Sequence, residues 1–317
     1  MGIIDIVELR KYFPVKKGTF AKREWLKAVD GVNFSVKKGA VFSLVGESGS
    51  GKSTVARLVL RLLPPTSGQI FFQDKDVWKL RGNSLRQFRK SVQIIFQDPF
   101  ASLNPRMTVF DTISEPLKIH KLVKKSEIKG NVVSLLNSVG LRADILNRYP
   151  HEFSGGQRQR ICIARALAVS PEVIVADEPL SALDVSIQAQ ILNILQELKN
   201  KSNISFLFIS HDLRVVQYFS DEIAVIYLGK IVEYSKSDEL FSKPLHPYTI
   251  VLLASAPKIK SDGKKRTILK GDVPSMIDIP DGCPFHPRCP RRFEPCDKIV
   301  PELKDENGRL VSCHLFR

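Results

Sequence analysis

The chain has 317 residues, of which 43% are hydrophobic, so it can bury a full core as one large domain or two modest ones. Its 48 Lys and Arg outnumber its 33 Asp and Glu, and the net charge of +15 favours polyanionic neighbours such as nucleotides, nucleic acids or anionic lipids. No apolar run is long enough to span a membrane, and the N-terminus has no basic stretch followed by an apolar signal region. We therefore expect a globular cytosolic protein that is neither membrane-spanning nor exported.

A glycine-rich segment lies between a predicted strand and a predicted helix. The apolar run 40–45 predicts a buried strand, and an apolar periodic run that continues to Leu63 predicts a helix. Between them stand Gly46, Glu47, Ser48, Gly49, Ser50, Gly51, Lys52, Ser53 and Thr54. Glycine, four residues and Gly-Lys-Ser is the spacing of a phosphate-binding loop, whose backbone N–H groups face the phosphates. We expect Lys52 to reach the β- and γ-phosphates of a nucleotide and the Ser53 hydroxyl to bind Mg²⁺.

The middle of the chain is predicted to be mostly helical. Residues 92–96 form a second apolar strand, followed by Pro99, which argues against a helix that starts at once. An amphipathic helix over 132–139 ends at Gly140, and a second helix follows a Ser-Gly-Gly segment and continues to residue 168.

Strands and helices alternate again in the second half. Apolar runs at 173–176 and 204–209 predict two buried strands with a helix over 187–198 between them, and 223–233 looks like a hairpin that turns at 228–229. This alternation predicts a mostly parallel sheet. After about residue 240 the composition shifts to proline, cysteine and charge, which predicts a small irregular appendage.

Two acidic residues end the strand at 173–176, at the edge where α/β proteins bind ligands. Asp177 is expected to hold Mg²⁺, directly or through water, and Glu178 to act as a base or to position water. An acidic pair on the surface is the plain alternative, but its place directly after a buried strand favours chemistry. Loop and carboxylates together predict a nucleotide triphosphatase.

A second glycine-rich segment is, by itself, only a flexible turn before a helix. Its neighbours are informative: the chain reads, in order, Phe153-Ser154-Gly155-Gly156-Gln157-Arg158-Gln159-Arg160, Asp177-Glu178-Pro179, Ser181-Ala182-Leu183-Asp184 and His211. In motif and order, residues 1–240 resemble the ATPase subunit of ATP-binding-cassette (ABC) transporters. The resemblance implies an α/β fold: a P-loop (RecA-like) ATPase core with an N-terminal antiparallel β subdomain (1–97 and 171–240), an inserted helical signature subdomain (98–170) and a small C-terminal cysteine-containing extension (241–317).

The same resemblance assigns roles to single residues. It makes Gln97 the glutamine that touches Mg²⁺ and the membrane partner, Glu178 the catalytic glutamate and His211 the histidine that contacts the γ-phosphate. Asp184 would close the loop that crosses the dimer. The signature residues Ser154, Gly155, Gly156 and Gln157 would bind the ATP of a second subunit. Phe153 stands where the family usually has leucine, outside the serine and glycines that meet phosphate.

The resemblance also implies that the adenine ring stacks on an aromatic residue before the phosphate loop. Tyr12 and Phe13 both qualify, and alignment with the family pattern favours Phe13.

Three stretches indicate a narrower resemblance, to the oligopeptide/dipeptide permease ATPases: Phe13–Gly18, Leu180–Ile191 and His246–Thr249. Gln157 and Ser181-Ala182 make the chain more similar to the F-type than to the D-type subunit. The resemblance implies a heterodimer with a D-type ATPase on the cytoplasmic face of the membrane, beneath two membrane subunits fed by an extracytoplasmic solute-binding protein. Import of oligosaccharides or metal is an alternative. Action on DNA or ribosomes is a further one, although no nucleic-acid module is present and no nucleic-acid partner is expected.

Four of the five cysteines lie close together near the end of the chain: Cys283, Cys289, Cys296 and Cys313. Cys162 lies apart and is expected to be a small core residue. Four thiolates can hold one cluster, and Cys-Pro pairs are typical of iron–sulfur loops. Zinc and unliganded thiols are alternatives, whereas a reducing cytosol disfavours disulfides. Some peptide-permease ATPases carry a [4Fe–4S] cluster on such cysteines, so the resemblance adds that cofactor to ATP and Mg²⁺.

Overall fold

A computed structural model describes residues 2–16, 23–255 and 274–316. The chain divides into two compact units, the first comprising Met1–Lys37, Val41–Trp78 and Ser210–Arg317, and the second Lys38–Ala40 and Lys79–Ile209. Lys17 and Gly18, which end the Phe13–Gly18 stretch used above, lie outside the described residues.

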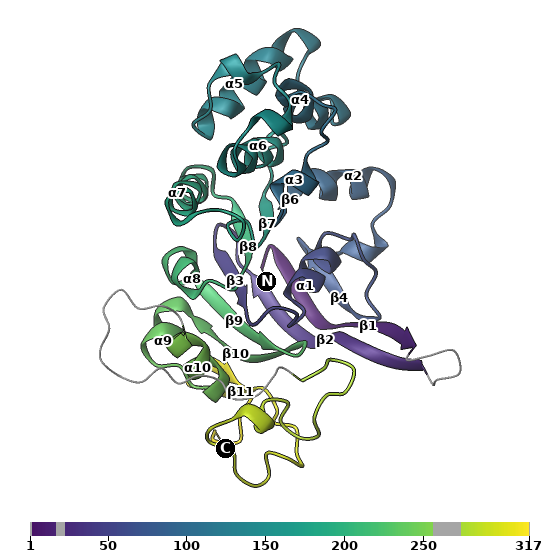
Figure 1. The fold of residues 1–317 in the computed structure, drawn as a ribbon. Helices are drawn as coiled ribbons and strands as arrows, with labels where there is room; N and C mark the ends of the chain where they lie inside the picture. Colours follow the sequence, from purple (N-terminus) through teal and green to yellow (C-terminus); the bar gives the residue numbers. More distant parts are fainter. Residues whose placement is uncertain (1, 17–22, 256–273, 317) are drawn as a thin grey trace. The chain divides into compact units, whose positions relative to one another are not determined.

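The first unit contains an antiparallel sheet with the strand order β2-β1-β4-β5 (Figure 1). Its strands are β1 (Ile4–Lys16), β2 (Arg23–Val36), β4 (Ser67–Phe72) and β5 (Lys75–Asp76). β1 pairs antiparallel with both β2 and β4, and its residues Ile4, Ile6 and Leu9 are at most 3% exposed. This sheet confirms the antiparallel β subdomain expected at the N-terminus.

A second set of strands in this unit leads to the phosphate loop. In spatial order they are β3 (Val41–Val45), β9 (Glu222–Tyr227), β10 (Lys230–Lys236), β12 (Arg309–Val311) and β11 (Lys304–Glu306). β3 and β9 are parallel, and the other neighbours are antiparallel. The predicted hairpin is β9–β10, and Leu228 and Gly229 at its turn both have positive φ, as a tight two-residue hairpin loop requires.

The described residues of this unit also form four α-helices: α1 (Lys52–Val59), α8 (Leu213–Phe219), α9 (Ser237–Ser242) and α10 (Pro247–Ser255). One of these, α10, and the strand β12 lie in the part predicted to be an irregular appendage. That prediction is wrong in this respect: α10 is a helix, and β12 extends the sheet by pairing with β10. The composition misled because these elements are short and alternate with proline-rich and cysteine-rich segments.

A buried ion pair anchors the C-terminal part of the chain, which is described over residues 241–255 and 274–316, to β10. Glu233 is fully buried, and its carboxylate accepts a hydrogen bond of 2.8 Å from the Arg309 guanidinium. The backbone N–H groups of Leu245 and His246 each donate to the same carboxylate at 2.9 Å. A buried carboxylate is stable only when donors satisfy it in this way.

The second unit holds three parallel strands, β6 (Val92–Ile95), β7 (Val173–Asp177) and β8 (Ser205–Ser210), with β7 in the middle. Every residue of β7 and β8 is buried, which explains why continuous apolar runs predicted them. The helices are α2 (Gly82–Ser91), α3 (Pro99–Ser102), α4 (Val109–Ile119), α5 (Ile128–Ser138), α6 (Gly155–Leu167) and α7 (Val185–Ser202). α6 packs against α3, α4, α5 and α7 (Figure 1), so it forms the centre of the helical region.

Helix α3 contradicts the prediction that Pro99 delays the next helix. Pro99 is instead its first helical residue, a position where the missing N–H of proline is not needed. Asp98 is extended and caps the helix, because its carboxylate accepts the N–H of Phe100 at 2.8 Å. Proline favours an extended backbone conformation at the residue before it. The capping residue of a helix is extended in any case, so Pro99 does not prevent the helix from starting.

The two units confirm the predicted fold class: an antiparallel N-terminal sheet, parallel core strands and a helical region between β6 and β7 in the chain. Among the helices that the structure describes, none combines the length and the apolar character needed to cross a membrane.

Replacing Glu233 by alanine should lower the free energy of unfolding by about 3–5 kcal/mol, because the Arg309 guanidinium would then be buried without its charge partner. Urea unfolding measures the change. Glu302→Ala, at an exposed carboxylate in the same C-terminal part, should stay within about 0.5 kcal/mol of the parent protein. Equal stability of the two variants would contradict the anchoring role.

Candidate functional site

The predicted phosphate loop lies between β3 and α1 in the first unit. Lys52 is 4% exposed, and its ammonium group donates hydrogen bonds of 2.9 Å to the carbonyl oxygens of Gly46 and Glu47. The N–H of Ser50 donates to the Glu47 carbonyl at 3.2 Å and closes the loop as a turn. α1 has no acidic residue in its first turn, so nothing in the helix opposes an anion at its positive end. The geometry suits a phosphate group.

Close backbone contacts require two of the loop's glycines. Gly51 has a φ of 105°, and a Cβ there would lie 2.1 Å from the carbonyl oxygen of Ala28 in β2. A Cβ on Gly46 would lie 2.3 Å from the carbonyl oxygen of Ile226 in β9. No side chain fits at either position, so β2 and β9 determine the shape of the loop.

The predicted carboxylates lie at the end of β7 in the second unit. Asp177 is the last residue of the strand and is 7% exposed, and Glu178 follows it. The Gln97 side-chain amide donates to Glu178 Oε2 at 3.1 Å, although the two residues are 81 positions apart. The structure thus brings together two residues that were predicted separately.

Glu178 also has an unusual backbone conformation. Its φ of 46° lies in the left-handed region that favours glycine, and its N–H donates to the Ile209 carbonyl of β8 at 3.0 Å. A non-glycine residue in a sparsely populated conformation costs about 1–3 kcal/mol, and such strain concentrates at functional positions. Here it falls on the residue predicted to activate water.

The signature segment begins helix α6. The Ser154 hydroxyl accepts the Gln157 N–H at 3.4 Å, and Gln157 Oε1 accepts the Ser154 N–H at 3.1 Å, so the two residues form a capping box. The first turn has no acidic residue. Like α1, this helix therefore presents a positive end that suits an anion.

The two signature glycines differ in what they contact. A Cβ on Gly156 would lie 2.5 Å from Cγ2 of Ile187, so Gly156 is needed where α6 packs against α7. A Cβ on Gly155 would meet only Cδ2 of Leu183 at 3.5 Å, an ordinary contact. Within the described part of the chain, packing does not explain why residue 155 is glycine.

Two glutamines that the sequence analysis missed fix the loop between Glu178 and Asp184. Gln159, fully buried on α6, donates to the Pro179 carbonyl at 2.8 Å. Gln188 on α7 donates to the carbonyls of Leu180 and Leu183 at 3.0 Å each. Both lie within motif stretches that the sequence analysis used, but it gave neither of them a role.

Asp184 and His211 lie in different units. Asp184 caps α7 in the second unit, where the Ile187 N–H and the Ser186 hydroxyl donate to its carboxylate at 2.9 and 2.8 Å. These hydrogen bonds, that of Ile187 first, lower the pKa of Asp184. His211 is exposed, directly after β8, and belongs to the first unit with the phosphate loop and Phe13.

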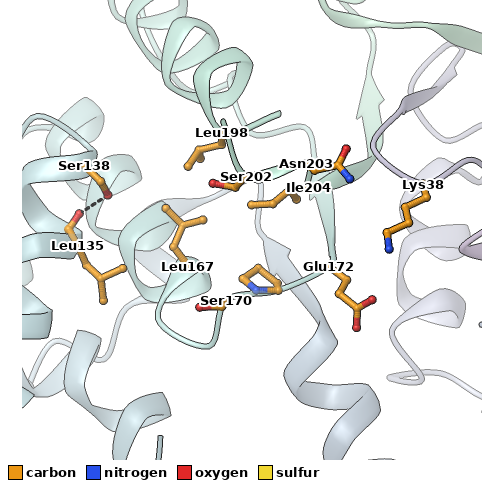
Figure 2. Close-up of a pocket in the computed structure, with 11 residues that line it drawn as sticks. Lys38, Leu135, Ser138, Leu167, Ser170, Glu172, Leu198, Ser202, Asn203 and Ile204 are labelled. Carbon is orange, nitrogen blue, oxygen red and sulfur yellow. Dashed lines mark hydrogen bonds between the residues drawn. The ribbon is translucent and has the colours of Figure 1, made fainter. Parts of the chain in front are cut away.

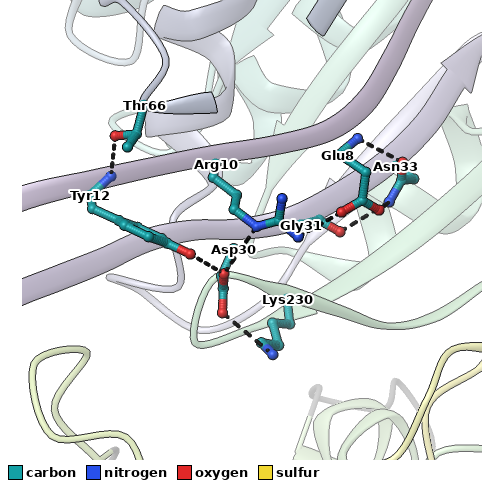
Figure 3. A network of polar contacts seen from close by, with 8 residues as sticks. All are labelled: Glu8, Arg10, Tyr12, Asp30, Gly31, Asn33, Thr66 and Lys230. Carbon is teal, nitrogen blue, oxygen red and sulfur yellow. Dashed lines mark hydrogen bonds and ion pairs between the residues drawn. The ribbon is translucent and has the colours of Figure 1, made fainter. Parts of the chain in front are cut away.

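A polar network around Asp30 holds Tyr12, one of the two candidates for adenine stacking (Figure 3). The Tyr12 hydroxyl donates to Asp30 at 2.5 Å, and Arg10 and Lys230 form ion pairs with the same carboxylate at 3.7 and 3.4 Å. Burial and then the contact with Asp30 raise the pKa of Tyr12 to about 12. Burial would raise the pKa of Asp30, but the Tyr12 hydrogen bond and the Lys230 charge outweigh it and lower that pKa. Successive strand residues alternate in direction, so Phe13 faces away from this network.

The four C-terminal cysteines line one cavity of the first unit, together with residues that include His246 and Phe285. All are free thiols, and burial, reinforced by the neighbouring cysteines, raises the pKa of Cys283 to about 11. Within residues 2–16, 23–255 and 274–316, no three His, Cys, Asp or Glu residues are arranged to hold a metal ion. The four thiols share one cavity, as the resemblance implies for the ligands of one cluster. Cys162 is 1% exposed, which confirms it as a core residue.

A hollow of about 550 Å³ lies elsewhere in the second unit (Figure 2). It is lined by Leu135 and Ser138 of α5, Leu167 at the end of α6, and Leu198 and Ser202 near the end of α7, among others. It contains none of the predicted site residues and is therefore separate from the nucleotide-binding residues.

Comparison with known proteins identifies the family. Residues 29–181 match the family described as ABC transporter, and residues 232–296 match the oligopeptide/dipeptide transporter, C-terminal region. The oligopeptide transport ATP-binding protein AppF of Bacillus subtilis (strain 168) is 49% identical, over 99% of this chain and 97% of that protein. The chain belongs to the ABC transporter ATPases. The dipeptide transport ATP-binding protein DppF of Escherichia coli (strain K12) is 45% identical to this ABC transporter ATPase, over 98% of this chain and 93% of that protein.

Solved structures share the fold of this ABC transporter ATPase. A dimer of the ATP-binding cassette MJ0796 in a post-hydrolysis state, bound to ADP and Pi, is 29% identical with a TM-score of 0.65, covering 74% of this chain and 98% of that one. The cbiO1 protein of Clostridium perfringens, part of the ABC transporter complex cbiONQ, is 26% identical with a TM-score of 0.65, covering 79% and 93%. The prediction of an ABC-type ATPase with a peptide-permease C-terminal part is confirmed.

Proposed function

We propose that this ABC transporter ATPase drives the import of oligopeptides or dipeptides. The match of residues 232–296 to the oligopeptide/dipeptide transporter C-terminal region carries the proposal, because an ATPase core by itself does not specify a solute. The names of the two bacterial relatives support the same solute class. Import of oligosaccharides or metal, and action on DNA or ribosomes, are the competing functions.

In this proposal, residues 46–54 hold the phosphates of ATP. The loop's backbone N–H groups and the end of α1 supply positive potential, and Lys52 neutralises part of the phosphate charge. Mg²⁺ would be held by Ser53, Gln97 and Asp177, whose side-chain oxygens are the donors that this cation prefers. When bound, the cation offsets the charge that develops on the transferred phosphoryl group.

Glu178 is the proposed general base. The Gln97 amide orients its carboxylate, and the strained backbone of Glu178 holds it directly after β7. His211 would contact the γ-phosphate. Phe13 is the proposed adenine-stacking residue, because alignment with the family pattern favours it over Tyr12.

The signature residues Ser154–Gln157 would serve a different nucleotide, the one bound by a D-type ATPase in a heterodimer. What supports this is Gly155: packing of the described residues does not require glycine there, so close approach by a phosphate from another subunit explains it. Asp184 would close the loop that crosses the dimer. ATP binding would then close the dimer and move the two membrane subunits.

We propose that these functions belong to separate parts of the chain. Residues 1–97 and 171–240 would form the ATP-binding core, 98–170 the helical signature subdomain and 241–317 the C-terminal extension. The ATPase would lie on the cytoplasmic face of the membrane beneath two permease subunits, and the extracytoplasmic solute-binding protein would act on it only through them.

Gly155→Ala should reduce the activity that depends on the signature without reducing the stability of the chain. Stability should stay the same or rise by up to about 1 kcal/mol, because a Cβ fits and alanine favours a helix. ATP hydrolysis by the assembled transporter should fall by about tenfold or more, because the Cβ would hold the partner's phosphate away. Gly130→Ala on α5, where nothing lies within 4 Å of the added Cβ, is the matched control and should retain activity. Full activity of Gly155→Ala would refute the role.

Glu178→Gln should abolish ATP turnover in the assembled transporter while ATP binding persists, because the amide cannot accept the proton of the attacking water. Equilibrium ATP binding and phosphate release measure the two effects, and the ATP-bound dimer should accumulate. Glu115→Gln, at an exposed glutamate of α4, should leave both measurements unchanged. Unchanged turnover in Glu178→Gln would remove Glu178 from the mechanism.

Solute uptake tests the function as a whole. A strain that lacks this chain should lose uptake of labelled oligopeptides or dipeptides and keep uptake of labelled oligosaccharides. The intact chain should restore peptide uptake, and the Lys52→Ala variant should not. If the strain loses oligosaccharide uptake but keeps normal peptide uptake, the transported solute is an oligosaccharide and the peptide proposal is wrong.

The [4Fe–4S] cluster predicted on Cys283, Cys289, Cys296 and Cys313 stays a proposal. Their shared cavity supports it, and the absence of a metal-binding arrangement among the described residues opposes it. Iron and sulfide analysis of anaerobically purified protein decides between the cluster and free thiols.

A further inference from the structure

Three groups hold Glu47, which lies inside the phosphate loop. Its N–H donates to the Tyr248 hydroxyl at 2.9 Å, and its carboxylate accepts two hydrogen bonds from the Arg288 guanidinium at 2.8 and 3.0 Å. Its carbonyl accepts the Lys52 ammonium at 2.9 Å. Two of the three groups belong to the C-terminal part of the chain, and the third is the lysine expected to bind phosphate.

Arg288 is held firmly enough to act on the loop. It ends a short turn, His286–Arg288, between Cys283 and Cys289, and its side chain is only 6% exposed. The two-pronged contact with Glu47 is the strong form of a charge-assisted hydrogen bond. Arg288 also donates to the Tyr227 hydroxyl at 3.4 Å.

An aromatic cluster supports both C-terminal contacts. The rings of Tyr227, Tyr248 and Phe285 pack on one another, with centroids 4.7 to 5.4 Å apart. Tyr227 and Tyr248 are at most 1% exposed, and so is Phe285. The hydroxyl that holds the Glu47 N–H is therefore fixed by packing rather than free to rotate into solvent.

The contact also solves an electrostatic problem. Glu47 places a carboxylate, 22% exposed, in a loop whose other features attract phosphate. An unpaired carboxylate there would repel the nucleotide, and the partial burial of the pair limits screening by water. The Arg288 charge cancels it and leaves the positive potential of the α1 end and Lys52 to act on the ligand.

We propose that Arg288 is a positioning residue for ATP: by neutralising and fixing Glu47, it holds the carbonyl that orients Lys52 and keeps the phosphate loop attractive to polyphosphate. The C-terminal part thereby serves the nucleotide site of its own chain. This inference rests on the proposed function of residues 46–54 as the ATP-binding loop.

A set of variants of the full-length chain tests the inference by equilibrium binding of ATP and ADP. Arg288→Ala should weaken ATP binding by about tenfold or more, because removing one partner of a partly buried charge pair leaves the other charge uncompensated. The loss should be larger for ATP than for ADP, because repulsion by an uncancelled Glu47 grows with the charge of the ligand. Arg288→Lys should retain part of the affinity, since it keeps the charge but loses the two-pronged contact.

Adding Glu47→Gln to Arg288→Ala should restore most of the lost affinity, because the uncancelled charge is then gone. Arg292→Ala, at an exposed arginine of the same region that pairs with Asp297, is the matched control and should bind ATP like the parent chain. Thermal unfolding without nucleotide shows whether each variant folds. If Arg288→Ala fails to fold, the comparison of Arg288→Lys with and without Glu47→Gln replaces it.

A purely structural Arg288 would change the unfolding temperature and leave the ratio of ATP to ADP affinity unchanged. That result, or a Glu47→Gln change that restores nothing, would overturn the inference. Measurements on the parent chain and on Lys52→Ala distinguish a failure of the proposed ATP-binding function from a failure of the role of Arg288. If the parent chain binds no ATP, the proposed function fails; if it binds ATP and loses it in Lys52→Ala but not in Arg288→Ala, only the role of Arg288 fails.

Discussion

The close packing of backbone around the phosphate loop is the constraint on which the nucleotide site depends. The Ala28 carbonyl leaves no room for a side chain at Gly51. On the other side, the Gly229 N–H donates to the Ser50 carbonyl at 3.0 Å, and the Asp30 N–H donates to the Gly229 carbonyl at 2.9 Å. Strand β2 and the β9–β10 turn thus hold the loop in shape before any ligand binds, which spares the nucleotide the cost of ordering it.

The C-terminal part also holds the phosphate loop, through side-chain contacts rather than backbone packing. Glu233 and Arg309 hold it on β10, and Arg288 and Tyr248 reach from it to Glu47. Stability of the C-terminal part and the charge of the phosphate loop are therefore linked through a short series of buried and partly buried polar contacts. Such contacts are strong when every group is satisfied and costly when one partner is removed.

Local sequence patterns predicted the elements that depend on residues close together in the chain. Strands β7 and β8 are buried along their whole length, so continuous apolar runs revealed them, and Ser154 and Gln157 form a capping box that lies within four residues. Its place after a buried strand suggested the role of Glu178, family resemblance supplied that of Gln97, and the structure adds the hydrogen bond between them. Helix α3 was missed because proline was treated as a barrier rather than as a first helical residue.

Contacts between distant positions had no signal in the sequence. Glu47 and Arg288 are 241 positions apart, and Glu233 and Arg309 are 76 apart, so neither pair produces a periodic or spaced pattern. Gln159 and Gln188 are ordinary helical residues by composition, and only folding shows that both hold the loop after Glu178. For the same reason, the sequence could place the four C-terminal cysteines close together in the chain but could not determine whether their geometry suits a metal.

Hydrogen exchange at the two glycine-rich segments most directly tests whether they serve two different nucleotides. In the monomeric chain, ATP should slow exchange at the amides of 46–54 and leave those of 154–157 unchanged. In the transporter assembled with its partner ATPase, ATP should protect both segments. Equal protection of 154–157 in the monomer, or none after assembly, would contradict the division of the two segments between two nucleotides.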